Sequence, residues 1–183
     1  MIHPAIMEYL GTTPPEELDS GFLGYLCTLA EVSKVSREVA SAIVQELIDQ
    51  RTNIKLIASE NYSSIPTQFA MANLLTDKYA EGIPYQRFYE GCANVDAIES
   101  FACEQAKKLF NAEHAYVQPH SGADANLVAY WAILTAKVET PSLEELGIKD
   151  PGKVTQEQWA RIRERMGNQR LLGMDYYSGG HLT

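Results

Sequence analysis

The sequence predicts an α/β protein with a parallel sheet, and the prediction rests on the order of its elements. Residues 94–110 have the apolar spacing of an amphipathic helix, residues 114–117 are predicted as a strand, and residues 123–134 as a second helix. A tight turn, Pro119 to Gly122, joins that strand to the helix after it. Helix, strand, turn and helix in succession are typical of units in which helices cover a parallel sheet.

The composition excludes several classes of partner. The chain has 183 residues, 45% of them hydrophobic, which is enough for one domain with a core. Its formal net charge of -9 argues against a nucleic-acid backbone or an anionic membrane, since both attract positive fields. No apolar run approaches the roughly 20 residues of a bilayer span, and the N-terminus lacks a secretory signal pattern. We therefore predict a cytoplasmic protein that binds neither nucleic acid nor membrane.

The cysteines predict neither a disulfide framework nor a metal site. Cys27, Cys92 and Cys103 are an odd number, without C-x-x-C spacing and without a histidine at metal-ligand spacing. We expect free thiols in a reducing compartment.

Residues 1–53 predict an N-terminal arm followed by a helix. Thr12 to Asp19 carries a turn and helix-start signal, and the rest of residues 1–30 shows little pattern. From Val32 the apolar spacing indicates a helix with one buried face, which Ser33 or Ser36 could cap. The apolar positions of that helix include Val35, Val39, Ile43 and Leu47.

Residues 54–92 predict loops around one short helix. Ile54 to Ala58 is an apolar run that leads into a turn at Ser59, and Pro66 begins a helix that continues to Leu75. Between Tyr79 and Cys92, glycines, a proline and four aromatic residues fit neither a helix nor a strand period. We predict a loop there, and loops of this composition are commonly functional.

Residues 54–183 are predicted as one incomplete domain with an insertion at about 135–170. In the helix of residues 94–110, Asp96 followed by Glu99 resembles a capping pair. More than thirty residues separate Leu134 from the predicted strand at 171–174, whereas such connections usually take about 2 to 6. Within them Thr155 is predicted to cap a helix that ends at Met166.

Two side-chain patterns belong to these helices. Each of two predicted helices has apolar residues that are expected to face inwards. In the helix of residues 123–134 they are Leu127, Val128, Trp131 and Leu134, and in the helix that ends at Met166 they are Trp159, Ile162 and Met166. Four nearby arginines are predicted to form a solvated face: Arg161, Arg163, Arg165 and Arg170.

Polar side chains and turns mark candidate sites. Ser121, Gly122 and Ala123 lie between a strand and the first turn of a helix, where backbone N–H groups and the helix dipole form a cradle for an anion, usually phosphate. The alternative is a serine that only caps its helix. Glu81 has tyrosines on both sides in one loop, and partial burial there would raise its pKa and let it shuttle protons; the alternative is a solvated carboxylate.

A Ser/His hydrolase is not supported. His120 precedes Ser121, but adjacent side chains in a turn diverge, and no G-x-S-x-G elbow or orienting acid accompanies them.

Five ordered motifs resemble the serine hydroxymethyltransferase (glycine hydroxymethyltransferase) family. They are Leu56-Ile57-Ala58-Ser59-Glu60-Asn61-Tyr62, Lys78-Tyr79-Ala80-Glu81-Gly82, Arg87-Phe88-Tyr89-Glu90-Gly91-Cys92, Gln118-Pro119-His120-Ser121-Gly122-Ala123 and Gly179-Gly180-His181-Leu182-Thr183. The resemblance implies a fold-type I transferase dependent on pyridoxal 5'-phosphate (PLP), aspartate aminotransferase-like. The chain would supply the N-terminal arm and the first part of the large α/β/α domain. The implied reaction moves a one-carbon unit between serine and tetrahydrofolate, giving glycine.

The resemblance also implies a role for each motif. Ser121, Gly122 and Ala123 would bind the phosphate of PLP, and His181 would stack on the pyridine ring of PLP. Glu81 is the acid/base carboxyl, with Tyr79 and Tyr89 lining the same pocket, and Ser59 contacts the substrate carboxylate. Tyr176, Gly180, His181 and Leu182 border the folate site. A homodimer, or a tetramer, would form through residues 56–92, which reach into the partner's site.

Four features depart from the family. Tyr176 stands where a leucine usually contacts the folate, and Ser178 stands where a histidine usually precedes Gly-Gly. Family members usually connect the helix before residue 135 to the strand after residue 170 with only a few residues. None of the eight lysines has the Thr-rich setting of the family's Schiff-base lysine. We therefore expect the N-terminal portion of an enzyme, inactive on its own. The isolated chain is expected to be marginally stable or to aggregate, because its strands would leave open edges.

Two other functions stay open from the sequence. The chain could be a non-catalytic binding or dimerisation module that keeps the PLP fold. It could also belong to an enzyme of the same fold that acts on other β-hydroxy amino acids without folate, as Tyr176 and Ser178 allow.

Overall fold

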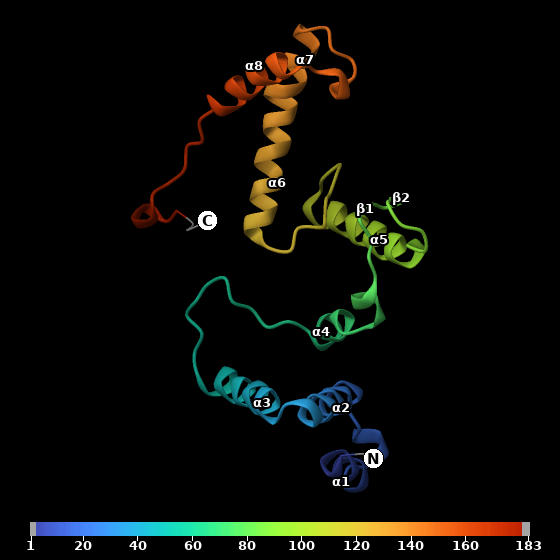
Figure 1. Cartoon of the computed structure of the whole chain (residues 1–183). Helices are drawn as coiled ribbons and strands as arrows, with labels where there is room; N and C mark the ends of the chain where they lie inside the picture. The colour runs from blue at the N-terminus through green and yellow to red at the C-terminus, as the bar shows by residue number, and fades with distance from the viewer. Residues whose placement is uncertain (1–2, 181–183) are drawn as a thin grey trace. The chain divides into compact units, whose positions relative to one another are not determined.

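The chain folds as two compact units, residues 1–79 and residues 80–183. The structure is a computed structural model, and it describes residues 3–180 (Figure 1). Each unit is described on its own.

The first unit is helical. Its α-helices are α1 (Pro4–Thr12), α2 (Ser20–Val35), α3 (Arg37–Thr52) and α4 (Ile65–Met71), and its 3-10 turns are η1 (Pro15–Glu17) and η2 (Leu74–Asp77). The predicted arm of residues 1–30 therefore contains α1 and most of α2, of which the sequence indicated only a helix start at Thr12 to Asp19. Asp19, at the end of the predicted start signal, caps α2 by accepting a hydrogen bond from the Phe22 N–H at 2.6 Å.

Ser36 divides the helix that was predicted from Val32. Its backbone is extended, with φ -145° and ψ 114°, so no helix can run through it. The Ser36 N–H donates to the Val32 carbonyl at 2.9 Å, which ends α2. Its Oγ accepts from the Val39 N–H at 3.2 Å, which begins α3. Of the two caps predicted, Ser36 is confirmed, whereas the Ser33 hydroxyl donates back to the Ala30 carbonyl.

Small side chains let the helices of the first unit approach. Ala30 of α2 and Ala40 of α3 are buried, at 6% and 9% exposure. Helix α4 packs against Gly24 of α2 so closely that a Cβ there would lie 2.6 Å from the Phe69 ring. Only glycine therefore fits this contact without a shift.

The second unit combines one short hairpin with helices. Strand β1 (Gly82–Ile83) pairs antiparallel with β2 (Gln86–Arg87), and Gly82 lies opposite Arg87. The helical elements are α5 (Ala93–Phe110), α6 (Gly122–Leu134), a π-helical turn η3 (Thr135–Glu139), α7 (Thr140–Glu145), η4 (Pro151–Lys153), α8 (Gln156–Gly167) and η5 (Tyr176–Ser178). Helices α5, α6 and α8 confirm three predicted helices.

The two predicted strands of this unit are not strands in the described chain. Residues 114–117 and 171–174 have no ladder partner among residues 3–180, where the only sheet is the β1–β2 hairpin. A strand exists only when a neighbour supplies hydrogen bonds, and parallel neighbours come from distant sequence. The predicted parallel sheet is therefore not formed within residues 3–180.

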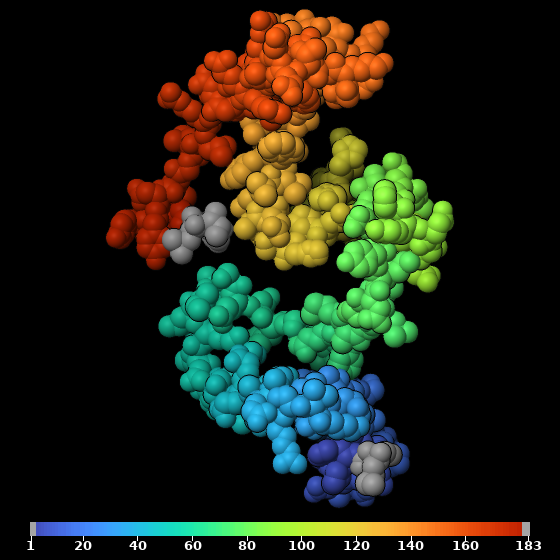
Figure 2. Space-filling view, viewed as in Figure 1, coloured from blue at the N-terminus to red at the C-terminus, as the bar shows by residue number. Residues whose placement is uncertain are grey.

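Helix α6 is apolar on every side and is largely uncovered. Leu127 and Trp131, which were predicted to face inwards, are 65% and 61% exposed, and the visible face of α6 carries no covering segment (Figure 2). Helices that are apolar all round are normally buried. Exposed apolar side chains throughout the described chain agree with the expectation that this chain is only part of a larger folded body.

The region predicted as an insertion is helical. Helix α6 continues through the π-helical turn into α7, where Pro141 has no N–H to donate and the Thr140 N–H bonds the Thr135 carbonyl five residues back. Thr155 begins α8 with a capping box, as predicted. Ile162 of α8 is 1% exposed, Trp159 and Met166 are half-buried, and the Arg165 guanidinium pairs with Glu145 at 2.7 Å.

No helix among residues 3–180 is long and apolar enough to cross a membrane.

Candidate functional site

A buried ion cluster organises the loop that carries Glu81. We call Arg87, Asp96, Glu99 and Gln118 the Arg87 clamp. The Arg87 guanidinium donates from Nε to Asp96 at 2.7 Å and from one terminal nitrogen to Glu99 at 2.7 Å. Its other terminal nitrogen donates to the carbonyls of Ala80 and Gly82, at 2.9 and 2.8 Å. One side chain therefore fixes both the residue before Glu81 and the residue after it.

The local sequence explains how Arg87 reaches this position. The hairpin turns at Pro84 and Tyr85, and Tyr85 has a φ of 64°. Gly82 has a φ of 109°, and a Cβ there would lie 2.4 Å from the Gln86 carbonyl oxygen. Glycine is needed at this position because the opposite strand passes so closely.

Asp96 and Glu99 do not cap α5, so the prediction of a capping pair is wrong. Helix α5 begins after Cys92 with no side-chain cap, and both carboxylates bind Arg87 instead. Carboxylates three residues apart lie on one face of a helix, and that spacing serves a capping box and an arginine clamp equally well. The Arg87 clamp was missed because its cation lies nine residues away from Asp96 in the sequence.

The clamp keeps Arg87 charged. The hydrogen bond to Glu99, followed by the bond to Asp96, raises the pKa of Arg87 and outweighs the opposing effect of burial. The side chains of Arg87, Asp96 and Glu99 are only 4%, 9% and 13% exposed, so water screens these contacts little. Charges that are buried in this way have to be paired, and here both carboxylates share one guanidinium.

Gln118 connects the clamp to the segment before Ser121. Its Nε2 donates to the Gly82 carbonyl at 2.8 Å and to the free oxygen of Glu99 at 2.7 Å. The Tyr116 hydroxyl donates to the Gln118 side-chain oxygen at 2.9 Å. The structure therefore brings together the loop of Glu81 and the start of the predicted phosphate cradle, which are far apart in the sequence.

The cradle residues adopt the geometry that an anion site needs. Ser121 is the N-cap of α6, and its Oγ accepts from the Asp124 N–H at 3.0 Å. The N–H groups of Gly122 and Ala123, at the first positions of a helix, have no intrahelical acceptor. A Cβ at Gly122 would meet no atom within 4 Å, so the space beside the cradle is open. These residues fit a phosphate, which the two N–H groups and the helix dipole would bind.

The proposed acid/base residues lie at the surface of this chain. Glu81 is exposed, and its carbonyl accepts from the Phe88 N–H at 2.9 Å. Tyr89 is 45% exposed, and its ring meets Phe88 edge-on with 5.1 Å between centroids. The burial that the neighbouring tyrosines predict for Glu81 would therefore have to come from outside the described residues.

Ser59 and Tyr79 belong to the first unit. Ser59 is exposed in a turn that the Glu60 N–H closes by donating to the Ile57 carbonyl at 3.0 Å. Tyr79, the last residue of that unit, is 73% exposed. The predicted turn at Ser59 is confirmed, while the roles of both residues stay predictions.

The predicted folate segment forms a tight turn. The Asp175 carboxylate accepts from the Ser178 N–H at 2.8 Å, and the Gly180 N–H donates to the Asp175 carbonyl at 2.9 Å. A Cβ at Gly180 would collide with the Met174 carbonyl oxygen. Tyr176 is 64% exposed beside this turn. His181 and Leu182 lie outside the described residues.

A metal centre has no support in the described part of the chain. Residues 3–180 contain no cluster of three histidine, cysteine or carboxylate side chains that could hold an ion. None of the three cysteines forms a disulfide in that part of the chain, and Cys92 is buried.

Comparison with known proteins identifies the family. The family model described as "Serine hydroxymethyltransferase" matches residues 32–163, which include the Arg87 clamp and the cradle. The chain therefore belongs to the serine hydroxymethyltransferase family.

Individual relatives carry the same name. The chain is 58% identical over all 183 residues to a serine hydroxymethyltransferase of Treponema pallidum (strain Nichols), of which it covers 32%. It is 50% identical over 165 residues, 90% of the chain, to that of Mycolicibacterium smegmatis, of which it covers 34%. It is 51% identical over 159 residues, 87% of the chain, to that of Salinispora tropica, of which it covers 33%. The chain spans about a third of the length of the curated relatives it matches.

Proposed function

We propose that the chain is the N-terminal part of a PLP-dependent serine hydroxymethyltransferase of fold-type I. The whole protein would move a one-carbon unit between serine and tetrahydrofolate, with glycine as the product. The observation that supports this most is the Arg87 clamp, because it connects the loop of Glu81 to the segment before Ser121 through Gln118. In the assembly proposed below, this one frame would hold the cradle of its own site and the carboxyl that reaches into the partner's site.

The cradle would hold the cofactor phosphate. The N–H groups of Gly122 and Ala123 would donate to it, and the Ser121 cap would keep the first turn of α6 in place. PLP, when bound, supplies an electron sink for the substrate's α-carbon. His181 would stack on its ring.

Glu81 would carry the proton between the substrate hydroxyl and its surroundings. Tyr79 and Tyr89 would line the pocket and exclude water, which would strengthen each charge interaction within it. Ser59 would bind the carboxylate of serine or glycine. Tyr176, Gly180, His181 and Leu182 would border tetrahydrofolate. The tight turn closed at Asp175 would fix the backbone of Tyr176 and Gly180.

The assembly that we propose is a cytoplasmic homodimer, or a tetramer, formed through residues 56–92. Its support is the exposure of residues that would otherwise be buried: Leu56, Ile57, Tyr79 and Phe88 are 88%, 61%, 73% and 79% exposed. A second copy that covers them would also remove water from Glu81.

The proposal is tested with the full-length protein that carries this chain. After borohydride reduction, its intact mass should rise by one reduced pyridoxyl group, and glycine should exchange its α-proton faster when tetrahydrofolate is present. Glu81→Gln should retain the adduct and lower kcat by about 10²- to 10⁴-fold, the range of general acid–base catalysis. Glu104→Gln, on the surface of α5, is the matched control and should change neither.

The outcomes separate the alternatives. A protein without an adduct would support a non-catalytic chain that keeps the fold. An adduct with no effect of tetrahydrofolate on proton exchange would support an enzyme that acts on other β-hydroxy amino acids. Full activity in Glu81→Gln would show that another group moves the proton.

A further inference from the structure

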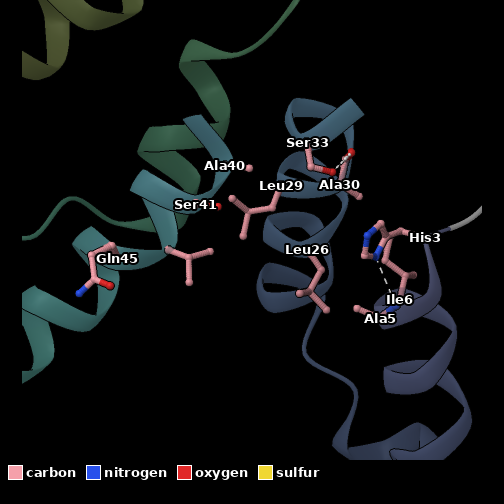
Figure 3. Close-up of a pocket in the computed structure, with 11 residues that line it drawn as sticks. His3, Ala5, Ile6, Leu26, Leu29, Ala30, Ser33, Ala40, Ser41 and Gln45 are labelled. Atoms are coloured by element: carbon pink, nitrogen blue, oxygen red, sulfur yellow. Dashed lines mark hydrogen bonds between the residues drawn. The ribbon is translucent and has the colours of Figure 1, made fainter. Parts of the chain in front are cut away.

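The first unit contains a pocket that the proposed reaction does not use. It has a volume of about 370 Å³ and lies among α1, α2 and α3, each of which contributes side chains (Figure 3). We call it the N-terminal pocket and define it by His3, Ile6, Leu26, Leu29, Ala40 and Val44. Residues 1–31, which include α1 and most of α2, lie outside the segment that the family model matches.

The floor of the N-terminal pocket is apolar. Ile6 is 8% exposed, Ala30 and Ala40 are buried, and Leu26 and Leu29 are half-buried. The polar groups at its edge are already partly bonded: the Ser33 hydroxyl donates to the Ala30 carbonyl at 2.8 Å. An apolar body in this pocket would therefore leave the Ser33 hydroxyl paired.

The size of the pocket limits its ligand. Its volume of about 370 Å³ lies within the range of roughly 300 to 1,000 Å³ that is usual for ligand pockets. A cavity of about 150 Å³ holds benzene, so a ligand of on the order of 10 to 15 non-hydrogen atoms fits here.

The mouth of the pocket carries positive charge. An adjoining hollow of about 470 Å³ shares His3, Ser33, Ala40 and Ser41 with the N-terminal pocket and adds Lys34 and Arg37. Lys34 pairs with Glu31 at 2.5 Å, and the Glu38 carboxylate accepts from the Ser36 hydroxyl at 3.1 Å. The Arg37 side chain makes no ion pair or hydrogen bond among residues 3–180. One unpaired guanidinium therefore stands at the mouth.

His3 adds a second donor. Its Nδ1 accepts from the Ala5 N–H at 3.3 Å, as the dashed line in Figure 3 shows. In the neutral ring Nε2 then carries the proton and is free to donate.

We propose that the N-terminal pocket binds a small amphipathic monocarboxylate, with its apolar body between α1, α2 and α3 and its carboxylate at the mouth. Arg37 supplies the charge that the carboxylate meets, because Lys34 is already paired. The chain as a whole carries a net charge of -9, so this local positive charge, rather than the overall field, selects an anion. The residues of this pocket belong to the first unit, whereas the cradle and Glu81 belong to the second.

The test is calorimetric titration of the full-length protein with decanoate, which has 12 non-hydrogen atoms and so falls in the estimated range of about 10 to 15. Decan-1-ol serves as the uncharged ligand of equal chain length. Decanoate should bind saturably with one site per chain. Arg37→Gln should weaken it about tenfold, since loss of one charge-assisted contact is worth about that factor. Arg51→Gln is the matched control, because Arg51 lies near the other end of α3 and does not line the N-terminal pocket.

The outcomes are decisive because binding, not activity, is measured. Saturable decanoate binding that is weakened in Arg37→Gln, unchanged in Arg51→Gln and stronger than decan-1-ol binding supports the site. Absent or non-saturable binding overturns it, as do equal losses in the two arginine variants or equal affinity for the alcohol. PLP retention is measured alongside, so failure of this site and failure of the proposed enzyme are distinguishable.

Discussion

Replacing Glu99 by glutamine should loosen the loop that carries Glu81. The two carboxylate oxygens of Glu99 accept from different donors, Arg87 at 2.7 Å and Gln118 at 2.7 Å. A glutamine has one acceptor oxygen and an NH₂ group. Whichever way the amide turns, its NH₂ faces a donor, so one of the two hydrogen bonds is lost.

The magnitude follows from the kind of bond that is lost. Hydrogen bonds to charged groups contribute about 1.5 to 3 kcal/mol, and Glu99 is only 13% exposed here, so screening by water is weak. A loss of about 2 kcal/mol corresponds to roughly a 30-fold rise in the population of the open loop, since about 1.4 kcal/mol is tenfold.

Hydrogen exchange of the full-length protein measures this opening. The Phe88 amide, which donates to the Glu81 carbonyl, should exchange roughly 30-fold faster in Glu99→Gln. Glu104→Gln is the control: Glu104 lies on the same helix and pairs with Lys107 at 2.7 Å, but its side chain is 57% exposed. Equal protection of Phe88 in the two variants would refute the role of the Arg87 clamp.

Three further predictions concern the second unit. Ile162→Ala should cost about 2 to 5 kcal/mol of the packing of α7 and α8, since Ile162 is 1% exposed; unchanged exchange protection of α8 would contradict this. Gly82→Ala should disrupt the hairpin, because its Cβ would lie 2.4 Å from the Gln86 carbonyl oxygen, and amide chemical shifts of the loop would report the change. The Arg165 hydrogen bond lowers the pKa of Glu145 below 4.5, so the stabilisation by this pair should be present at neutral pH and be lost as the pH falls through the lowered value. Exchange of α7 between pH 7 and pH 3 measures it, and Glu145→Gln should lack that pH dependence.

Local signals predicted the helices of the second unit well. Thr155 and Ser121 are polar caps that precede apolar spacing, and the side-chain bonds that define them span only three residues. Such contacts depend on nearby sequence alone, so a sequence pattern suffices to find them.

Contacts between distant residues could not be predicted in the same way. The segments 114–117 and 171–174 have strand-like composition, but a strand needs a neighbour, and no described residue supplies one. Asp96 and Glu99 have the spacing of a cap, yet a cation nine to twelve residues earlier in the chain determines their role. A charged residue next to an otherwise apolar helix face is the signal that could have indicated the Arg87 clamp.

The N-terminal helices were missed for another reason. Helix α2 has small residues, Gly24 and Ala30, at its contacts, where pattern reading looks for large apolar side chains. Close helix packing depends on such small residues, and their spacing carries little hydrophobic signal.

The cap at Ser36 bears on how this chain could have been assembled in evolution. Helix α3 takes its N-terminal hydrogen bond from its own cap residue and not from α2. The family match begins at residue 32, within one turn of that cap. The segment before a cap residue such as Ser36 can be gained, exchanged or lost, because the following helix keeps its own N-terminal cap. The start of α3 would therefore survive a change in the two helices before it.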